Sequence, residues 1–245
     1  MKIGFLGSGK MAHGILSAMT DASAALLSSV EDNHNVEIAR TCELIFLAVR
    51  PQDVDSVAAE VKPFLSAKQT VVSIVAGKTL RKLRQALGAK VNLIRVMPNL
   101  ALRAGAGMCA ICPGPKAPRR HLSEVERILG GAGATVVLKE RDFDAVTALS
   151  GSGPAYFAYM EEAMMEGGIA LGLKPAVARL LAEQTMYGTA KFLRESQMPL
   201  KPFIDGVCTK GGTTAAGMKH LATPSFKKII AKTLAAAAQR SKELA

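Results

Sequence analysis

Short runs of consecutive apolar residues recur through the first half of the chain, and each ends at a glycine, a proline or a polar turn. They occupy residues 2–6, 44–49, 71–75, 91–96, 106–111 and 135–138. Apolar runs of this length are typical of strands that are buried on both faces of a sheet. Segments with helical spacing lie between them, at residues 10–20, 53–65, 80–87 and 123–129. The alternation predicts an α/β domain with a mostly parallel sheet.

After about residue 140 the strand pattern ends and long helical stretches follow. Helices are expected to begin at Gly153-Pro154, at Pro175 and at Pro224, and a further one follows Gly212. Proline is favoured in the first turn of a helix. We therefore expect two domains: a Rossmann-like α/β domain over residues 1–139, shortened after its first helix, and an all-α domain over residues 140–245.

A glycine-rich turn joins the first predicted strand to the first predicted helix. From Gly7 to Ala12 its sequence is Gly-Ser-Gly-Lys-Met-Ala, which fits the pattern G-x-G-x-x-A. In this pattern the first glycine permits a tight turn, the second lets a pyrophosphate approach the backbone, and the small last residue allows close helix–strand packing. The turn predicts a dinucleotide-binding site, with an ordinary strand–helix turn as the alternative.

The residues near the end of the next strand bear on which dinucleotide binds. Ser28 and Ser29 offer hydroxyl donors that suit the 2′-phosphate of NADP, whereas Glu31 offers an acceptor that suits the free ribose of NAD. We expect NADP(H) to be favoured over NAD(H).

Two further motifs precede predicted helices. One is Ser-Gly-Ser-Gly-Pro at residues 150–154, and the other is Val-Cys-Thr-Lys-Gly-Gly-Thr-Thr at residues 207–214. In the second motif, free backbone N–H groups and threonine hydroxyls at a helix N-terminus form a site that suits a carboxylate. A capped helix start without a ligand is the alternative for both motifs.

Composition and charge narrow the class of protein. The chain has 245 residues, of which 49% are hydrophobic, so it can bury a substantial core. No apolar run has the length of a membrane span, and the N-terminus lacks the pattern of a signal peptide, so we expect a cytoplasmic protein. The net charge of +11 fits attraction of anionic small molecules better than nucleic-acid binding, because no nucleic-acid motif accompanies it.

The four cysteines fit free thiols in a reducing compartment. Cys109 and Cys112 form a C-x-x-C pair within a predicted strand. Side chains three residues apart on a strand point to opposite faces, so these two thiols would not converge on one metal. We expect no metal site.

Together, the motifs resemble the Δ1-pyrroline-5-carboxylate reductase family. The segments that carry the resemblance are IGFLGSGKMA at 3–12, FLAVRPQDV at 46–54, IRVMPN at 94–99, DAVTALSGSGPAY at 144–156 and VCTKGGTTAAGM at 207–218. The last two are the more specific. The resemblance implies an oxidoreductase that reduces a cyclic imine to L-proline with NAD(P)H, the last step of proline biosynthesis. It also implies a homodimer formed through the helical domain, which in some members assembles further into decamers.

The resemblance also assigns residues to the site. It places the cofactor pyrophosphate on Gly7, Ser8, Gly9, Lys10 and Met11, the adenosine side near Asn35, and the rest of the dinucleotide along Ala48, Val49, Arg50, Pro51, Ala76 and Gly77. It places Asn99 and Ser152 near the nicotinamide. It gives the substrate carboxylate to Thr209, Gly211, Gly212 and Thr213, and the imine nitrogen to Thr214. A protonated C=N bond is already electrophilic, so Thr214 would orient the nitrogen without acting as a strong acid.

Three features depart from the family pattern. The stretch between the first helix and residue 44 is shorter by about one helix and one strand, judged from usual element lengths. Leu100-Ala101 stand where Thr-Pro is usual, and Lys210 replaces a proline. These departures leave two alternatives open: a reductase of another cyclic imino acid or carbonyl acid, and a non-catalytic paralogue that binds nucleotide.

Overall fold

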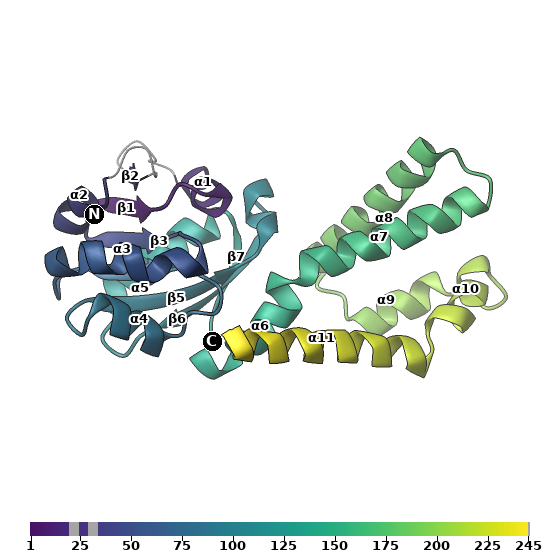
Figure 1. The fold of residues 1–245 in the computed structure, drawn as a ribbon. Helices are drawn as coiled ribbons and strands as arrows, with labels where there is room; N and C mark the ends of the chain where they lie inside the picture. Colours follow the sequence, from purple (N-terminus) through teal and green to yellow (C-terminus); the bar gives the residue numbers. More distant parts are fainter. Residues whose placement is uncertain (20–24, 29–33, 245) are drawn as a thin grey trace. The chain divides into compact units, whose positions relative to one another are not determined.

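A computed structural model describes residues 1–19, 25–28 and 34–244, and for residues 25–28 only the backbone is described. The chain forms two compact units (Figure 1). The first comprises residues 1–154 together with 235–245, and the second comprises residues 155–234.

A seven-stranded sheet is the centre of the first unit. Its strands are β1 (Ile3–Leu6), β2 (Ala25–Ser28), β3 (Leu44–Leu47), β4 (Thr70–Ser73), β5 (Asn92–Pro98), β6 (Gly107–Pro113) and β7 (Gly133–Val137). They lie in the order β2-β1-β3-β4-β5-β6-β7. The strands from β2 to β5 are parallel, β6 runs antiparallel to β5, and β7 is parallel to β6. The prediction of a mostly parallel sheet is confirmed.

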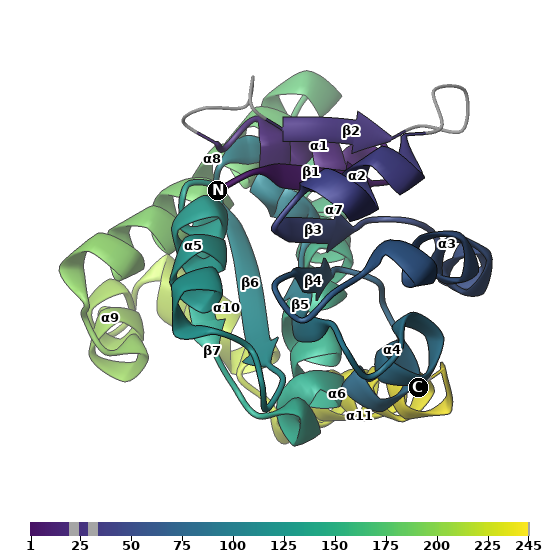
Figure 2. The ribbon, with the colours of Figure 1, turned by 90° about the vertical axis from the view of Figure 1, so that its left-hand side faces the viewer.

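Helices cover both faces of this sheet, α5 (Arg119–Gly130) on one side and α3 (Val54–Val61) and α4 (Leu80–Leu87) on the other (Figure 2). The strands alternate between two apolar clusters. Phe5 and Phe46 stack with ring centroids 4.7 Å apart in the cluster that contains α5 and α1 (Lys10–Leu16). Leu6 and Leu47 face the opposite cluster, which contains α3, α4 and α2 (Asn35–Thr41). Burial on both faces explains why the strands consist of consecutive apolar residues.

The stretch between α1 and β3 keeps a strand and a helix. β2 pairs in parallel with β1, from Ile3 opposite Ala25 to Leu6 opposite Ser28. α2 follows it and buries Ile38 and Ala39 against the sheet. We expected this stretch to be shorter by about one helix and one strand. That expectation was wrong, because a strand and a helix are both present. The elements here are short, since α1 and α2 have seven residues each and β2 has four.

The first unit closes with a series of short turns and with the end of the last helix. After β7 come a 3₁₀ turn (Glu140–Asp142), α6 (Phe143–Val146) and a π-helical turn, η6 (Thr147–Gly151). The last helix, α11 (Pro224–Leu244), returns to this unit, where the Ser241 hydroxyl donates to Asp144 at 2.7 Å. The anchored end of α11 explains why residues 235–245 group with the sheet.

The second unit is entirely helical, as expected. Its helices are α7 (Gly153–Ala170), α8 (Pro175–Ser196), α9 (Leu200–Val207), α10 (Thr213–Leu221) and the first part of α11. α9 was not expected from the sequence, and it contacts α8 through the Phe192 and Phe203 rings at 5.6 Å. In α8, which is described throughout, Ala178 and Ala182 are buried, and neither α9 nor α10 has a buried residue. Within one chain this unit therefore has little interior.

Among the described residues, no helix is both long enough and apolar enough to cross a membrane.

Candidate functional site

The glycine turn lies where the order of the sheet reverses. β1 is flanked by β2 on one side and β3 on the other, so the chain leaves β1 in one direction and returns on the opposite side. In open α/β sheets, ligands bind outside the carboxyl ends of the strands at such a point. Gly7 follows β1 there with φ +103°, and a Cβ on it would lie 2.7 Å from the carbonyl oxygen of Ala48, which follows β3. Only glycine fits this position, as the motif predicts.

The remainder of the turn is open to a ligand. Gly9 caps the N-terminus of α1 with extended φ −71°, and beyond the adjoining residues the nearest atom to a Cβ on it would be the Ala48 carbonyl oxygen at 3.9 Å. Ser8 and Met11 are half-buried and Lys10 is exposed. Ala12 is fully buried against the sheet, as its role in helix–strand packing requires. The turn thus fits a pyrophosphate, because Gly7 allows the chain to turn tightly and the backbone at Gly9 is open to a ligand.

Other residues predicted for the cofactor lie at the same edge of the sheet. Ala48, Val49, Arg50 and Pro51 follow β3, and Ala76 and Gly77 come shortly after β4. Arg50 is exposed and donates to Asp53 at 2.8 Å. Gly77 adopts φ +72°. Parallel strands bring these segments to the same edge of the sheet as Gly7. At Gly77 that edge also meets the end of α11, because a Cβ on Gly77 would lie 3.2 Å from the Leu244 carbonyl oxygen.

The adenosine end is described in part. Asn35 is the first residue of α2, and its amide donates to Glu60 at 2.8 Å. Ser28 ends β2, and its backbone is in register with Leu6. Ser29 and Glu31 lie outside the described residues. The choice between a 2′-phosphate and a free ribose therefore stays a prediction.

Asn99 and Ser152 lie in the first unit, on either side of the π-turn. Asn99 follows β5, and its side-chain amide donates to the Ser150 carbonyl at 3.2 Å. Ser152 is the residue that ends the turn. Leu100, at the position where the sequence departs from Thr-Pro, begins a 3₁₀ turn (Leu100–Ala104) and is exposed.

The threonine motif lies in the second unit and forms a tight turn before α10. The Gly212 N–H donates to the Thr209 carbonyl at 3.0 Å, and Gly211 adopts φ +78°. A Cβ on Gly212 would lie 2.6 Å from the Thr209 hydroxyl oxygen, so a larger residue there would displace that hydroxyl. Thr213 and Thr214 form the exposed first turn of α10, and Lys210 is exposed beside them. Hydroxyls and free N–H groups meet at one helix end, which suits a carboxylate.

Two of the thiols lie in β6, away from these segments, whereas Cys208 belongs to the threonine motif and the His13 ring lies 3.2 Å from the Gly9 carbonyl oxygen. Cys109 and Cys112 belong to different apolar clusters, on opposite faces of β6, as the strand pattern predicts. Burial raises the pKa of the Cys109 thiol to about 11, so it is an inert core residue. All four cysteines are free thiols. His13 lies exposed on α1.

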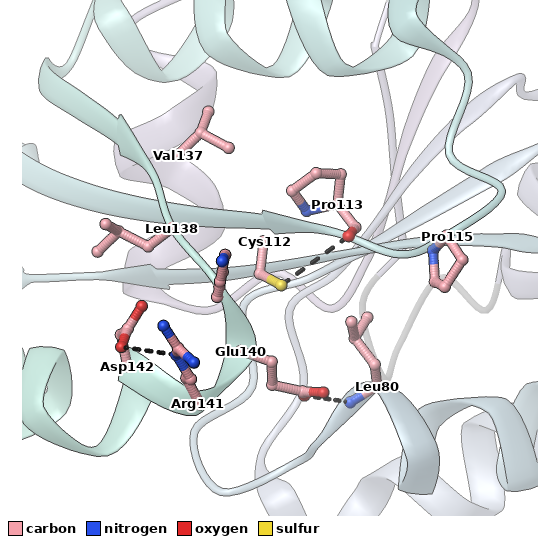
Figure 3. Close-up of a pocket in the computed structure, with 10 residues that line it drawn as sticks. Leu80, Cys112, Pro113, Pro115, Val137, Leu138, Glu140, Arg141 and Asp142 are labelled. Atoms are coloured by element: carbon pink, nitrogen blue, oxygen red, sulfur yellow. Dashed lines mark hydrogen bonds and ion pairs between the residues drawn. The ribbon is translucent and has the colours of Figure 1, made fainter.

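A hollow of about 670 Å³ opens elsewhere in the first unit (Figure 3). Its walls include Leu80, Cys112, Pro113 and the segment from Val137 to Asp142. Glu140 points across it toward the N-terminus of α4 and accepts from the Leu80 N–H. None of the residues predicted for cofactor or substrate lines this hollow. No sequence pattern predicted this hollow.

A doubly wound sheet with an obligatory glycine turn at its switch point defines the class of nucleotide-dependent α/β oxidoreductases. Two family models match the chain. One, described as pyrroline-5-carboxylate reductase dimerisation, matches residues 140–244. The other, described as NADP oxidoreductase coenzyme F420-dependent, matches residues 20–77. The chain belongs to the pyrroline-5-carboxylate reductase family, as its relatives show.

Curated relatives match over most of the chain. A pyrroline-5-carboxylate reductase of Synechocystis sp. is 38% identical over 210 residues, which cover 86% of this chain and 78% of the relative. That of Arabidopsis thaliana is 33% identical and covers 99% of this chain and 95% of the relative.

Solved structures agree in fold. A pyrroline-5-carboxylate reductase of Coxiella burnetii superposes with a TM-score of 0.93 at 28% identity, covering 100% of this chain and 98% of that one. A pyrroline carboxylate reductase of Plasmodium falciparum with NADP bound gives 0.87 at 29% identity, with the same coverage.

Proposed function

We propose that this protein is a pyrroline-5-carboxylate reductase, which reduces the cyclic imine to L-proline with NAD(P)H in the last step of proline biosynthesis. The observation that carries the proposal is that one chain keeps both specialised turns. It has the obligatory Gly7 at the switch point and the threonine turn before α10, in a sequence that aligns with such reductases over nearly its whole length. A non-catalytic paralogue would have no physical need for both.

The first unit supplies the cofactor site in this proposal. Gly7 to Met11 hold the pyrophosphate, Asn35 approaches the adenosine, and the segments at 48–51 and 76–77 line the dinucleotide. We favour NADP(H), because Ser28 and Ser29 offer hydroxyls to a 2′-phosphate and because a similar solved structure holds NADP. Bound there, the nicotinamide supplies the hydride that the imine carbon accepts.

The threonine turn supplies the substrate site. The turn formed by Thr209, Gly211, Gly212 and Thr213 binds the carboxylate through threonine hydroxyls and the N–H groups at the start of α10, while the Gly212 N–H stays bonded to the Thr209 carbonyl. Thr214 hydrogen-bonds the imine nitrogen. The exposed Lys210 adds a positive charge beside them. The residues hold the C=N bond in a fixed orientation, and the proton that ends on nitrogen is already there in the iminium form, so no strong acid is required.

We also propose a homodimer through the helical domain, residues 140–245, with the dinucleotide-binding domain at residues 1–139. Large apolar side chains such as Phe157, Tyr159 and Leu180 are exposed on α7 and α8 in one chain, and apolar patches of this kind mark protein interfaces. Assembly of such dimers into a decamer is tested by the mass in solution. The unpaired thiols fit a cytoplasmic location.

Turnover by the purified protein tests the function. We expect loss of nicotinamide absorbance when NADPH or NADH is mixed with Δ1-pyrroline-5-carboxylate. No oxidation of either cofactor would overturn the proposal. Thr214→Ala should lower kcat/KM about tenfold to a hundredfold, the value of one hydrogen bond to a charged group. Thr214→Ser should restore most of it, and NADPH binding by calorimetry should be unchanged in both variants.

Cofactor preference has its own test. Ser28→Asp should shift the ratio of kcat/KM for NADPH to that for NADH toward NADH by about tenfold or more, because a carboxylate repels the 2′-phosphate and accepts from a free ribose. An unchanged ratio would remove Ser28 from the site.

A second substrate is favoured by one observation, the lysine at position 210 beside the threonine turn. A panel of cyclic imino acids and carbonyl acids at fixed NADPH, repeated with Lys210→Pro, distinguishes the two. If pyrroline-5-carboxylate is the substrate, it should have the highest kcat/KM in both proteins.

A further inference from the structure

The side-chain amide of Asn99 is engaged at both ends within the first unit. Its Oδ1 accepts from the backbone N–H of Met108 on β6 at 3.1 Å, and its Nδ2 donates to the Ser150 carbonyl at 3.2 Å. The backbone N–H of Asn99 donates to the Met108 carbonyl at 3.1 Å, which fixes the residue against β6. The side chain therefore joins the end of the sheet to the turn that contains Ser150.

That turn has an uncommon backbone. In η6 the Ser152 N–H donates to the Thr147 carbonyl at 2.9 Å, five residues earlier, which is the bond of a π-helix. Single π-turns are concentrated at functional sites, where they alter the direction of a helix. Met97 of β5 also holds the turn, since a Cβ on Gly151 would lie 2.5 Å from the Met97 methyl carbon. Met97 and Asn99, two residues apart at one strand end, thus both lie against the turn, and Asn99 also bonds to it.

We propose that Asn99 is a positioning residue: by holding the Ser150 carbonyl it fixes the π-turn at residues 147–151, and through it the place of Ser152. The effect on turnover rests on the proposed function and on the place near the nicotinamide that the family resemblance implies for Ser152. Asn99 then acts through Ser152 and the turn, and its contribution is geometric.

An aspartate at position 99 gives a sharp test, because it has the shape of asparagine and can be titrated. As a carboxylate, it would place a negative oxygen at the position from which Nδ2 donates to the Ser150 carbonyl. Once protonated, it can donate to Ser150 and accept from Met108, so both bonds return. A carboxyl that faces a carbonyl oxygen has a pKa above its usual value of about 3.9.

We expect kcat of Asn99→Asp to be about one-tenth of the wild-type value near pH 8, the loss expected for one positioned hydrogen bond. The ratio to wild type should rise at least about fivefold by about pH 5.5, as the carboxyl is protonated. KM for NADPH should change less than about twofold, because KM reports binding and the turn affects orientation. Asn99→Ala should stay low at every pH. A flat ratio for Asn99→Asp, or a change confined to KM, would overturn the proposal.

Asn92 provides a matched control at the other end of β5. Its buried amide donates to the carbonyls of Ala67 and Gln69, far along the strand from the π-turn. Asn92→Asp should lower the unfolding temperature, yet its kcat relative to wild type should not vary with pH below that temperature. A pH-dependent kcat in both variants would show a general effect of weakening β5 and would count against the role of Asn99.

Hydrogen exchange provides a readout that does not depend on activity. In Asn99→Ala, the Ser152 amide should exchange about tenfold faster than in the wild type, because the turn has lost one of its two attachments. If the variant does not fold, Asn99→Asp gives the same comparison between high and low pH. If the wild type has no reductase activity but the Ser152 amide still exchanges faster in the Asn99 variants, the proposed function is refuted and the positioning role is not. An active wild type whose variants keep both turnover and exchange would refute the positioning role.

Discussion

The two glycines of the nucleotide turn can be replaced separately, and the structure predicts different results. Gly7→Ala would force a side chain onto φ +103°, with its Cβ 2.7 Å from the Ala48 carbonyl oxygen and 3.0 Å from a Val49 methyl carbon. Gly9→Ala keeps φ −71° and ψ 173°, which any residue adopts, and approaches nothing outside the adjoining chain closer than 3.9 Å. The first change affects the fold, and the second leaves the fold nearly intact.

The sizes of the two effects follow from this geometry. Left-handed backbone costs a non-glycine residue about 1–2 kcal/mol, and a clash with a fixed carbonyl adds a similar amount. Gly7→Ala should therefore lower the free energy of unfolding by about 3 kcal/mol, which corresponds to about 6–12 °C in Tm for a chain of this length. Gly9→Ala should cost about 1 kcal/mol, because alanine is a poorer N-cap than glycine but meets no clash at this position.

Nucleotide binding at the turn should depend strongly on Gly9, although Gly9→Ala affects stability less than Gly7→Ala does. In a dinucleotide turn the pyrophosphate approaches the backbone of the second glycine, so a Cβ on Gly9 would lie in its path. We expect the Kd of Gly9→Ala for NADPH to rise at least about tenfold, or about 1.4 kcal/mol. Calorimetry measures Kd, and thermal unfolding with and without NADPH checks it by linkage. If Gly9→Ala bound NADPH within about twofold of the wild type, the pyrophosphate would not lie on this turn.

Three further predictions concern stability and assembly. Glu140→Ala should lower the free energy of unfolding by about 3 kcal/mol in denaturant, because it leaves the guanidinium of Arg95, 5% exposed, without the carboxylate 3.0 Å away. Adding Arg95→Met should recover part of the loss, and strictly additive costs would contradict this. Burial, together with the nearby Arg120, lowers the pKa of His121 below 6.5, so the unfolded chain takes up the proton first as pH falls. Tm should therefore drop between about pH 7 and about pH 5. His121→Gln, which can still bond Thr70, should make this fall of Tm with pH smaller. An equal fall in the variant would assign the acid sensitivity to other groups. Leu180→Glu should halve the mass measured by light scattering. Leu180 is 64% exposed in one chain, and a twofold dimer would bury two copies of it, each worth about 1.5–3 kcal/mol. An unchanged mass would place the interface elsewhere.

The strands and the glycine turn could be predicted because their causes are local. Burial on both faces makes a parallel strand apolar at every position, so the segments at 3–6 and 44–47 stand out from the sequence without knowledge of their neighbours. Gly7 is recognisable for a similar reason, since a tight turn after a strand and before a helix needs glycine whatever lies around it.

Other features depend on contacts between distant segments, and the sequence carries little trace of them. The direction of β6 follows from the short 3₁₀ connection at Leu100–Ala104, which cannot cross over the sheet. α9 contains Pro202 inside eight residues and follows Pro199, a pattern that also fits a loop. The bond from Asn99 to the Ser150 carbonyl joins residues 51 positions apart in sequence, so the motif identified Asn99 without this contact.

The helical unit carries the threonines that we propose bind the substrate, yet one chain gives it almost no interior. Ala178 and Ala182 are the buried residues of α8, and α10, which presents Thr213 and Thr214, has none. Since burial of apolar surface is the main favourable term in folding, contacts within one chain are too few to fix these helices. In the homodimer that we propose, a second copy supplies the missing surface. Association and folding of this unit are then linked, and the order of the threonine turn depends on the dimer. The oligomer is on this reasoning a condition of substrate binding as well as of stability.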